Sequence, residues 1–205
     1  MATLEGLYAI TPDTDDSERL IELVSDVLPH GVRLLQYRNK SQDPVRRLWQ
    51  ANLLASLCHS HGVTFIVNDD VELALAVGAD GVHLGRDDAA IAAARARLGA
   101  DAIIGASCYD DIKLAEAAVA AGASYVAFGA VFPSGTKPHA VRAPLQLFAQ
   151  AKRLGVPSAA IGGITADNAG EVVSAGADML AVIGALFDAA DPAATAEQLA
   201  AAFRR

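Results

Sequence analysis

Cysteine is scarce in this sequence. Only Cys58 and Cys108 occur among 205 residues, which is too few for a disulfide framework or for a zinc cluster built on thiolates. This usage is compatible with a reducing cytosol. A metal site in this chain would therefore have to use oxygen ligands.

An excess of positive charge is also absent. The net charge is −8, whereas a general nucleic-acid binder needs clustered Lys and Arg to contact phosphate backbones. We therefore expect no nucleic-acid partner. A local basic pocket for a small anion stays compatible with this net charge.

Long apolar runs are missing as well. The longest strongly apolar stretch, Met179 to Phe187, falls well short of the ~20 residues that span a bilayer, so we expect no membrane contact. Residues 1–6 lack the basic start and the long apolar segment of a signal peptide. These two observations predict a cytoplasmic protein.

What the chain has in abundance is apolar surface. Hydrophobic residues make up 53% and charged residues 20%, a balance that supports a folded core and gives no sign of disorder. A chain of 205 residues is long enough for one sizeable domain and short for two. No linker or low-complexity segment divides it, so we expect a single domain over residues 1–205.

Glycines mark a repeat along the chain. Each of seven glycines follows a helix-like segment and precedes an apolar run: Gly31, Gly62, Gly78, Gly99, Gly122, Gly155 and Gly176. Glycine at such a junction supplies the left-handed conformation that commonly ends a helix. With an opening strand at Gly6 to Ile10, the repeat predicts eight strands alternating with eight helices, the last near 193–203.

This alternation predicts an α/β fold, a (β/α)8 TIM barrel near the lower end of its usual size range. An open doubly wound sheet is the alternative. The loop from Thr11 to Thr14 lacks the glycine-rich phosphate fingerprint of that fold, which favours the barrel. In a barrel the loops after all strands share one face, so their polar residues can be considered as one site.

The third predicted strand carries polar residues at its carboxyl end. The run Phe65 to Asp70 is wholly apolar until it ends in Asn68 and two carboxylates, as expected for a buried strand with ligands at its tip. Alternatively, Asp69 or Asp70 only caps the helix that begins near Val71.

Neighbouring strand ends are polar too. After the second strand, alternation directs Gln36, Arg38 and Lys40 to one side, although a solvated edge would also be rich in Arg and Lys. His83 at the fourth strand lies among apolar neighbours, which favours a hydrogen-bonded structural role over a catalytic one. The fifth strand leads to Ser107.

Later loops offer anion-binding groups. Ser134, Thr136 and Lys137 supply hydroxyls and an ammonium that suit a phosphate, although an ordinary turn uses similar residues. Gly163 and Gly184, after the seventh and eighth strands, let backbone N–H groups approach an anion, and tight packing is the alternative reason for these glycines. We expect a side chain at Gly163 to block the anion and leave the fold intact.

The charges suggest a metal. Carboxylates at Asp69 and Asp88 beside Arg38, Lys40 and Lys137 would repel a bare phosphate. They are reconciled if Mg²⁺ bridges them to a diphosphate, because this ion prefers hard oxygen ligands. The predicted cofactor is therefore Mg²⁺, and the predicted partners are small phosphorylated substrates.

The motifs together resemble those of the thiamine-phosphate synthase family, over essentially the whole chain. They are Tyr8-Ala9-Ile10-Thr11, Gln36-Tyr37-Arg38-Asn39-Lys40, Val67-Asn68-Asp69-Asp70, Gly81-Val82-His83-Leu84-Gly85, Gly105-Ala106-Ser107, Thr136-Lys137 and Gly162-Gly163-Ile164-Thr165. The resemblance implies a (β/α)8 transferase that joins hydroxymethylpyrimidine diphosphate to hydroxyethylthiazole phosphate. The products would be thiamine phosphate and diphosphate.

The resemblance also implies roles for individual residues. Asp69 and Asp88 would hold Mg²⁺, and Gln36 would contact the pyrimidine. The diphosphate would be bound by Arg38, Lys40, Asn68, Ser107 and Lys137, of which Arg38, Lys40, Ser107 and Lys137 are expected to be catalytic. The thiazole phosphate would be bound by Ser134, Thr136, Gly163, Ile183 and Gly184.

The chain departs from the family pattern at a few positions. Arg86 and Asp87 stand where Gln and Glu are common, Ser134 stands where Thr is usual, and Cys108-Tyr109 replaces a small residue and His. Two other functions stay open at this point: a thiazole tautomerase on the same barrel and a non-catalytic sensor of a phosphorylated ligand. Tyr109 and the Asp69/Asp88 pair argue against the tautomerase. Assembly into a homo-oligomer is also left open.

Overall fold

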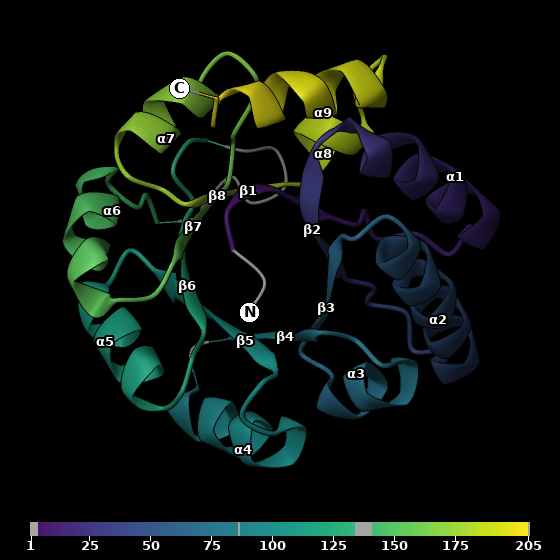
Figure 1. Cartoon of the computed structure of the whole chain (residues 1–205), viewed down its shortest axis with the longest axis horizontal. Helices are drawn as coiled ribbons and strands as arrows, with labels where there is room; N and C mark the ends of the chain where they lie inside the picture. The colour runs from purple at the N-terminus through teal and green to yellow at the C-terminus, as the bar shows by residue number, and fades with distance from the viewer. Residues whose placement is uncertain (1–3, 86, 134–140, 205) are drawn as a thin grey trace.

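The computed structural model describes residues 4–85, 87–133 and 141–204, and of Asp88 it describes only the backbone. Eight parallel strands pair in chain order and close into a barrel, with β8 beside β1 (Figure 1). The strands are β1 Gly6–Ile10, β2 Val32–Tyr37, β3 Thr64–Asn68, β4 Gly81–Leu84, β5 Ile103–Tyr109, β6 Tyr125–Gly129, β7 Ser158–Ile161 and β8 Met179–Val182.

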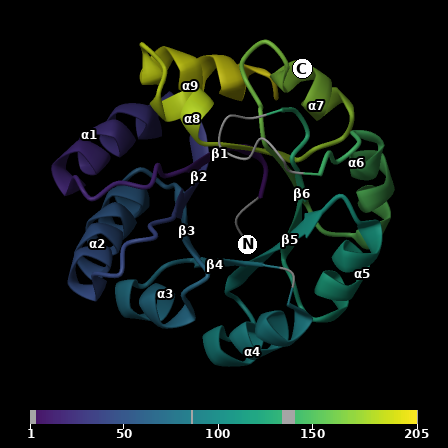
Figure 2. The ribbon, with the colours of Figure 1, turned by 180° about the vertical axis from the view of Figure 1, so that it is seen from behind.

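Helices surround the barrel on its outside, as both views show (Figures 1 and 2). They are α1 Ser17–Val27, α2 Pro44–Ser60, α3 Val71–Val77, α4 Asp88–Leu98, α5 Ile112–Ala120, α6 Gln146–Ala151, α7 Ala169–Ser174, α8 Gly184–Phe187 and α9 Pro192–Ala201, with 3-10 turns η1 Leu28–His30 and η2 Lys152–Leu154. The predicted (β/α)8 barrel is confirmed. The short helix α8, between β8 and α9, was not predicted. In the described ranges, no helix has both the length and the apolar character needed to cross a bilayer.

The glycines that define the repeat have the expected positive φ, and Gly31, Gly78 and Gly155 adopt the left-handed conformation at a helix end, whereas Gly99 does not. All seven have positive φ angles, between 64° at Gly78 and 107° at Gly176. Helix α3 illustrates how local signals set both of its ends: the Asp70 carboxylate accepts the Leu73 N–H at its start, and Gly78 is left-handed at its end. The capping interpretation therefore holds for Asp70.

Strand alternation separates two apolar layers. One layer fills the space between the strands and the helices and includes Phe65, Val67 and Val82. The other fills the barrel interior and consists of Leu4, Tyr8, Ile10, Leu34, Tyr125, Ala127, Ala159, Met179 and Ala181. Side chains two positions apart on a strand point to the same side. Gln36 therefore faces inward like Leu34, two residues before it. By the same spacing, His83 after Gly81 and Ser107 after Gly105 also face the interior.

Arg95 of α4 ties two turns to the barrel. Its guanidinium donates to the carbonyl oxygens of Gly99 at 2.9 Å and Ala102 at 2.6 Å, before β5. It also donates to the Gly122 carbonyl at 2.8 Å and to the Ser124 hydroxyl at 3.0 Å, before β6. One side chain therefore satisfies polar groups at the starts of two strands.

We expect Arg95→Met to lower the free energy of unfolding by about 2–3 kcal/mol, because hydrogen bonds to a charged group are lost and their acceptors stay in place. Urea denaturation measures the change. Arg97→Met is the matched control, since the Arg97 guanidinium pairs with Glu72 at an exposed position on the same helix and its loss should change stability little. Equal effects of the two substitutions would contradict this account.

Candidate active site

The end of β2 is held by a buried threonine from the end of β1. The Thr11 N–H donates to the Gln36 carbonyl at 2.9 Å. The Thr11 hydroxyl accepts the Arg38 N–H at 2.9 Å and donates to the Arg38 carbonyl at 3.1 Å. Strand β2 ends at Tyr37, so the predicted alternation does not extend to Lys40. Thr11 fixes the backbone at Arg38 instead.

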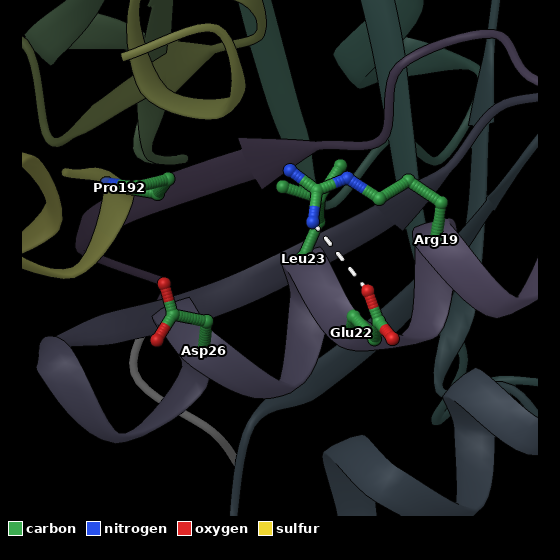
Figure 3. A pocket seen from close by; sticks show the side chains of 5 residues that line it. All are labelled: Arg19, Glu22, Leu23, Asp26 and Pro192. Atoms are coloured by element: carbon green, nitrogen blue, oxygen red, sulfur yellow. Dashed lines mark hydrogen bonds and ion pairs between the residues drawn. The ribbon is translucent and has the colours of Figure 1, made fainter. Parts of the chain in front are cut away.

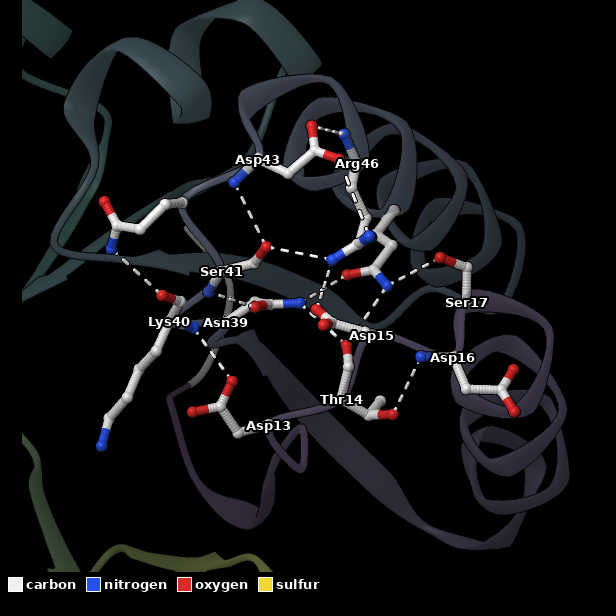
Figure 4. A network of polar contacts seen from close by, with 12 residues as sticks. Asp13, Thr14, Asp15, Asp16, Ser17, Asn39, Lys40, Ser41, Asp43 and Arg46 are labelled. Atoms are coloured by element: carbon white, nitrogen blue, oxygen red, sulfur yellow. Dashed lines mark hydrogen bonds and ion pairs between the residues drawn. The ribbon is translucent and has the colours of Figure 1, made fainter.

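Asp13 lies beside the two predicted cations of this loop. Its carboxylate accepts the Lys40 backbone N–H at 3.0 Å and lies 3.9 Å from an Arg38 guanidinium nitrogen. The Lys40 side chain itself extends away from the surrounding polar network (Figure 4). Asp13 therefore orients the loop through the Lys40 backbone N–H.

The same network joins the loops after β1 and β2 (Figure 4). Asn39 donates to the Gln50 side chain at 2.8 Å and to the Thr14 carbonyl at 3.0 Å. Gln50, buried on α2, donates onward to the Ser17 hydroxyl at 2.8 Å. Asn39 thus has a structural role between Arg38 and Lys40, because its side chain is committed to the neighbouring loop.

The carboxylates at the tip of β3 have different environments. Asp70 caps α3 and its carboxylate pairs with the Arg47 guanidinium at 2.8 Å. Asp69 is exposed, has a left-handed φ of 61°, and donates its N–H to the His83 carbonyl at 2.9 Å. Aspartate is one of the few residues that adopt this backbone region readily. Of the two carboxylates, Asp69 is the one left for a ligand.

The donor set at this tip suits a hard cation. The Asn68 amide donates to one Asp69 carboxylate oxygen at 2.7 Å, which orients the carboxylate at the end of the strand. Oxygen ligands of this kind are those that Mg²⁺ prefers. Among the described residues there is no group of three or more His, Cys, Asp or Glu that could hold a metal. The predicted second ligand, the Asp88 side chain, lies outside the described part, so the pair stays a prediction.

A chain of hydrogen bonds crosses the barrel interior. Gln36 donates its side-chain N–H to the Tyr8 hydroxyl at 2.7 Å, and the Tyr8 and Tyr125 hydroxyls are 2.7 Å apart. The Tyr125 hydroxyl lies 2.9 Å from His83 Nδ1, and His83 Nε2 lies 2.9 Å from the Ser107 hydroxyl. The chain thus connects two predicted substrate-binding residues, Gln36 and Ser107.

Burial keeps the side chains of this hydrogen-bond network uncharged. Desolvation lowers the pKa of His83 from 6.5 to about 4 and raises the pKa of Tyr8 to about 12. The pKa of Tyr125 is also raised well above its ordinary value by burial. The predicted hydrogen-bonded role of His83 agrees with its two side-chain contacts, and a neutral imidazole fits its position.

Backbone rather than side chains shapes the end of β7. Gly162 and Gly163 have φ angles of 101° and 67°. A side chain at Gly163 would overlap the Pro133 carbonyl and approach the Phe132 side chain within 2.7 Å. The expectation that a side chain at Gly163 leaves the fold intact is therefore wrong, because both the φ angle and the close packing require glycine.

Gly184 is the first residue of α8, after Ile183 at the end of β8. Its φ is not in the left-handed region, and an added Cβ would meet only the Asp188 carboxylate, at 2.9 Å. The other predicted phosphate ligands, Ser134, Thr136 and Lys137, lie outside the described residues, as does Arg86. The structure therefore describes Gly163, Ile183 and Gly184 from this group.

A groove on the outer surface lies apart from these residues. Figure 3 shows it between α1 and the start of α9, lined by Arg19, Glu22, Leu23, Asp26 and Pro192. None of the predicted site residues lines this groove. The candidate active site is instead at the carboxyl ends of the strands, where Gln36, Arg38, Asn68, Asp69 and Ser107 come from β2, β3 and β5 and the residues directly after them.

Comparison with known proteins assigns the chain. The family model described as thiamine monophosphate synthase matches residues 7–186. The chain belongs to the thiamine monophosphate synthase family. A thiamine-phosphate synthase of Chromobacterium violaceum is 67% identical over 200 residues, which are 98% of this chain and 97% of the relative. One from Azoarcus sp. is 62% identical over 190 residues, 92% of each chain.

A solved structure of a family member agrees. The thiamine phosphate pyrophosphorylase of Pyrococcus furiosus superposes with a TM-score of 0.81 at 36% identity, covering 95% of this chain and 93% of that chain. The resemblance seen in the motifs is therefore confirmed over nearly the whole length. A 3-hexulose-6-phosphate synthase at 24% identity and a TM-score of 0.70 shares the fold.

The buried His83 predicts a pH dependence of stability. Because its pKa is about 4 in the folded state and ordinarily 6.5, the unfolded state binds more protons between these values. The stability associated with neutral His83 is present above pH 6.5 and is lost as pH falls towards 4, by an amount on the order of 3 kcal/mol.

Urea denaturation across pH 4–7 measures this loss. His83→Gln should show a smaller fall in unfolding free energy than the unchanged chain, since glutamine does not titrate. His61→Gln is the control, because His61 is exposed at the end of α2. The unfolding free energies of His83→Gln, of the control and of the unchanged chain could instead decrease equally between pH 7 and pH 4. In that case, burying neutral His83 would not make stability depend on pH.

Proposed function

We propose that this chain catalyses the condensation of 4-amino-2-methyl-5-hydroxymethylpyrimidine diphosphate with 4-methyl-5-(2-hydroxyethyl)thiazole phosphate. The products are thiamine phosphate and diphosphate. The observation that carries the proposal is the presence of Arg38, Asp69 and Ser107 at the carboxyl ends of β2, β3 and β5 of one barrel. Relatives up to 67% identical among those compared are named thiamine-phosphate synthase, which supports the same reaction.

The proposed binding residues divide between two substrates. Gln36 contacts the pyrimidine, and the diphosphate is bound by Arg38, Lys40, Asn68, Ser107 and Lys137. The thiazole phosphate is bound by Ser134, Thr136, Gly163, Ile183 and Gly184. Backbone N–H groups at Gly163 and Gly184 support the second assignment, because loops after the seventh and eighth strands and a short extra helix commonly form the phosphate site of such barrels.

Asp69 and Asp88 are proposed to hold Mg²⁺. Bound there, the ion neutralises charge on the diphosphate and makes it a better leaving group. The exposed Asp69 carboxylate, oriented by Asn68, supports this assignment. Arg38, Lys40 and Lys137 add positive charge from the chain itself.

The chemistry requires charge stabilisation more than proton transfer. The bond between the pyrimidine methylene carbon and the diphosphate oxygen breaks, and its electron pair leaves with the diphosphate. The thiazole nitrogen donates its lone pair to the same carbon and has no proton to lose, so no general base is needed. Preorganised donors around the departing oxygens are the main catalytic device in such a site.

The remaining assignments follow from the same reaction. The partners are small phosphorylated molecules, and the net charge of −8 supports the absence of a nucleic-acid partner. The cytoplasm is the proposed location, supported by the sparse use of cysteine.

A phosphate-ligand sensor on this barrel would bind thiamine phosphate without accelerating its formation, so an activity assay separates it from the enzyme.

The decisive experiment supplies both phosphorylated precursors to the purified protein with Mg²⁺ and measures thiamine phosphate. Product should form with Mg²⁺ and not in excess chelator. Asp69→Asn and Asp88→Asn should each raise the Mg²⁺ concentration needed for half-maximal rate, because one anionic oxygen ligand is lost.

Asp101→Asn is the matched control for these variants. Asp101 is exposed in the turn before β5, on the opposite side of the barrel from the strand tips. The Asp101→Asn variant should need the same Mg²⁺ concentration for half-maximal rate as the unchanged chain. Full activity of the Asp69 variant in excess chelator would reject the metal assignment, and no product from the unchanged chain would reject the enzyme.

Gly184→Ala tests the thiazole-phosphate assignment. The added methyl group stands at the proposed phosphate site and only displaces the flexible Asp188 carboxylate. KM for the thiazole phosphate should rise by at least about tenfold, while KM for the pyrimidine diphosphate changes less. Gly170→Ala in the first turn of α7 is the control, since a Cβ there meets no atom within 4 Å. Equal KM increases for both substrates would count against this subsite.

A further inference from the structure

The hydrogen-bond chain in the barrel has one consistent direction. The Gln36 side-chain nitrogen can only donate, so the Tyr8 hydroxyl accepts at this contact. The Tyr8 hydroxyl therefore uses its own hydrogen toward the remaining partner, the Tyr125 oxygen, 2.7 Å away. Tyr125 in turn donates toward His83 Nδ1 at 2.9 Å.

The imidazole passes this direction to Ser107. A neutral histidine carries one ring proton, and burial keeps His83 neutral. Because Nδ1 accepts from Tyr125, the ring proton lies on Nε2 and is donated to the Ser107 hydroxyl oxygen at 2.9 Å. The hydrogen of Ser107 is then not needed by His83 and is available to a ligand.

We propose that Tyr8, Tyr125 and His83 are positioning residues that fix the direction of the Ser107 O–H, so that Ser107 donates a hydrogen bond to the diphosphate. The inference rests on the proposed function for the identity of that anion. If the imidazole carried its proton on Nδ1 instead, Nε2 would take the hydrogen of Ser107 and turn a lone pair toward the anion. The chain of tyrosines thus prevents a repulsive arrangement.

The barrel makes room for this arrangement. Gly105 lies two residues before Ser107 on β5, and a Cβ at Gly105 would overlap the Tyr125 ring. Tyr125 also stacks on the His83 ring at a centroid distance of 5.6 Å and meets Tyr8 edge-on at 5.9 Å. Ring packing therefore holds the three hydrogen-bonding atoms in place, independently of any ligand.

A double-mutant cycle between Tyr125→Phe and Ser107→Ala tests the proposal. Tyr125→Phe removes the hydroxyl that selects the His83 tautomer and should lower kcat about tenfold, the size of one lost oriented hydrogen bond. In the Ser107→Ala background the same substitution should change kcat less than twofold, because no hydroxyl is left to orient. Tyr8→Phe should act in the same direction and guards against misfolding of the Tyr125 variant.

Tyr37→Phe is the matched control. Tyr37 is another buried tyrosine, and its hydroxyl donates to Gln50 outside the interior chain at 2.8 Å. Any effect of Tyr37→Phe on kcat should be the same with Ser107 or with Ala at that position. Equal fold-changes of Tyr125→Phe in both backgrounds would mean that Tyr125 acts through general stability, and would overturn the proposal.

Two measurements do not depend on turnover. Long-range proton–nitrogen NMR spectra should place the His83 proton on Nε2, and Tyr125→Phe should add the Nδ1 tautomer. Titration with magnesium diphosphate should show weaker binding by Tyr125→Phe, and no further weakening when Ser107→Ala is already present. If the protein forms no thiamine phosphate but these results hold, the proposed function fails and the orientation of Ser107 stands. A proton on Nδ1 in the unchanged chain would refute the orientation.

Discussion

The pairing of β1 with β8 is the constraint on which the rest of the molecule depends. Gly6 lies opposite Met179 and Ala9 opposite Val182 in this parallel register, so the sheet closes without a free edge. Closure brings all the carboxyl ends of the strands to one rim. Residues as distant in sequence as Thr11 and Gly184 can therefore contribute to one site, because Thr11 directly follows β1 and Gly184 lies two residues after β8.

Closure also creates an interior that is mostly apolar, in which polar atoms are costly unless they are hydrogen-bonded. Gln36, Tyr8, Tyr125 and His83 meet this demand by bonding to one another, and the network ends at Ser107, which is partly exposed. Such a network specifies a single arrangement because any member turned away leaves another unsatisfied. The proposed substrate-binding residues Gln36 and Ser107 are thereby supported by the core itself.

Local sequence signals predicted the scaffold well. Gly78 ends α3 and Asp70 begins it because backbone preference and capping act within a few residues. Contacts between distant residues were not accessible in this way. Nothing near Thr11 or Asp13 indicates that they hold the Arg38 and Lys40 backbone, and no local pattern joins Tyr8 to Tyr125 across 117 residues. Thr11 and Arg38 become neighbours when β1 pairs with β2, and Tyr8 and Tyr125 when the barrel closes.

The left-handed backbone at Asp69 restricts how this position can evolve. Glutamate would keep the carboxylate but accommodates this conformation less readily than aspartate, and β-branched residues do so at greater cost. Asparagine and glycine fit the backbone and lose the charge. The proposed role of Asp69 as a cation ligand and the left-handed φ angle at this position thus both favour aspartate. Few substitutions at residue 69 would therefore preserve both the backbone conformation and the negative charge.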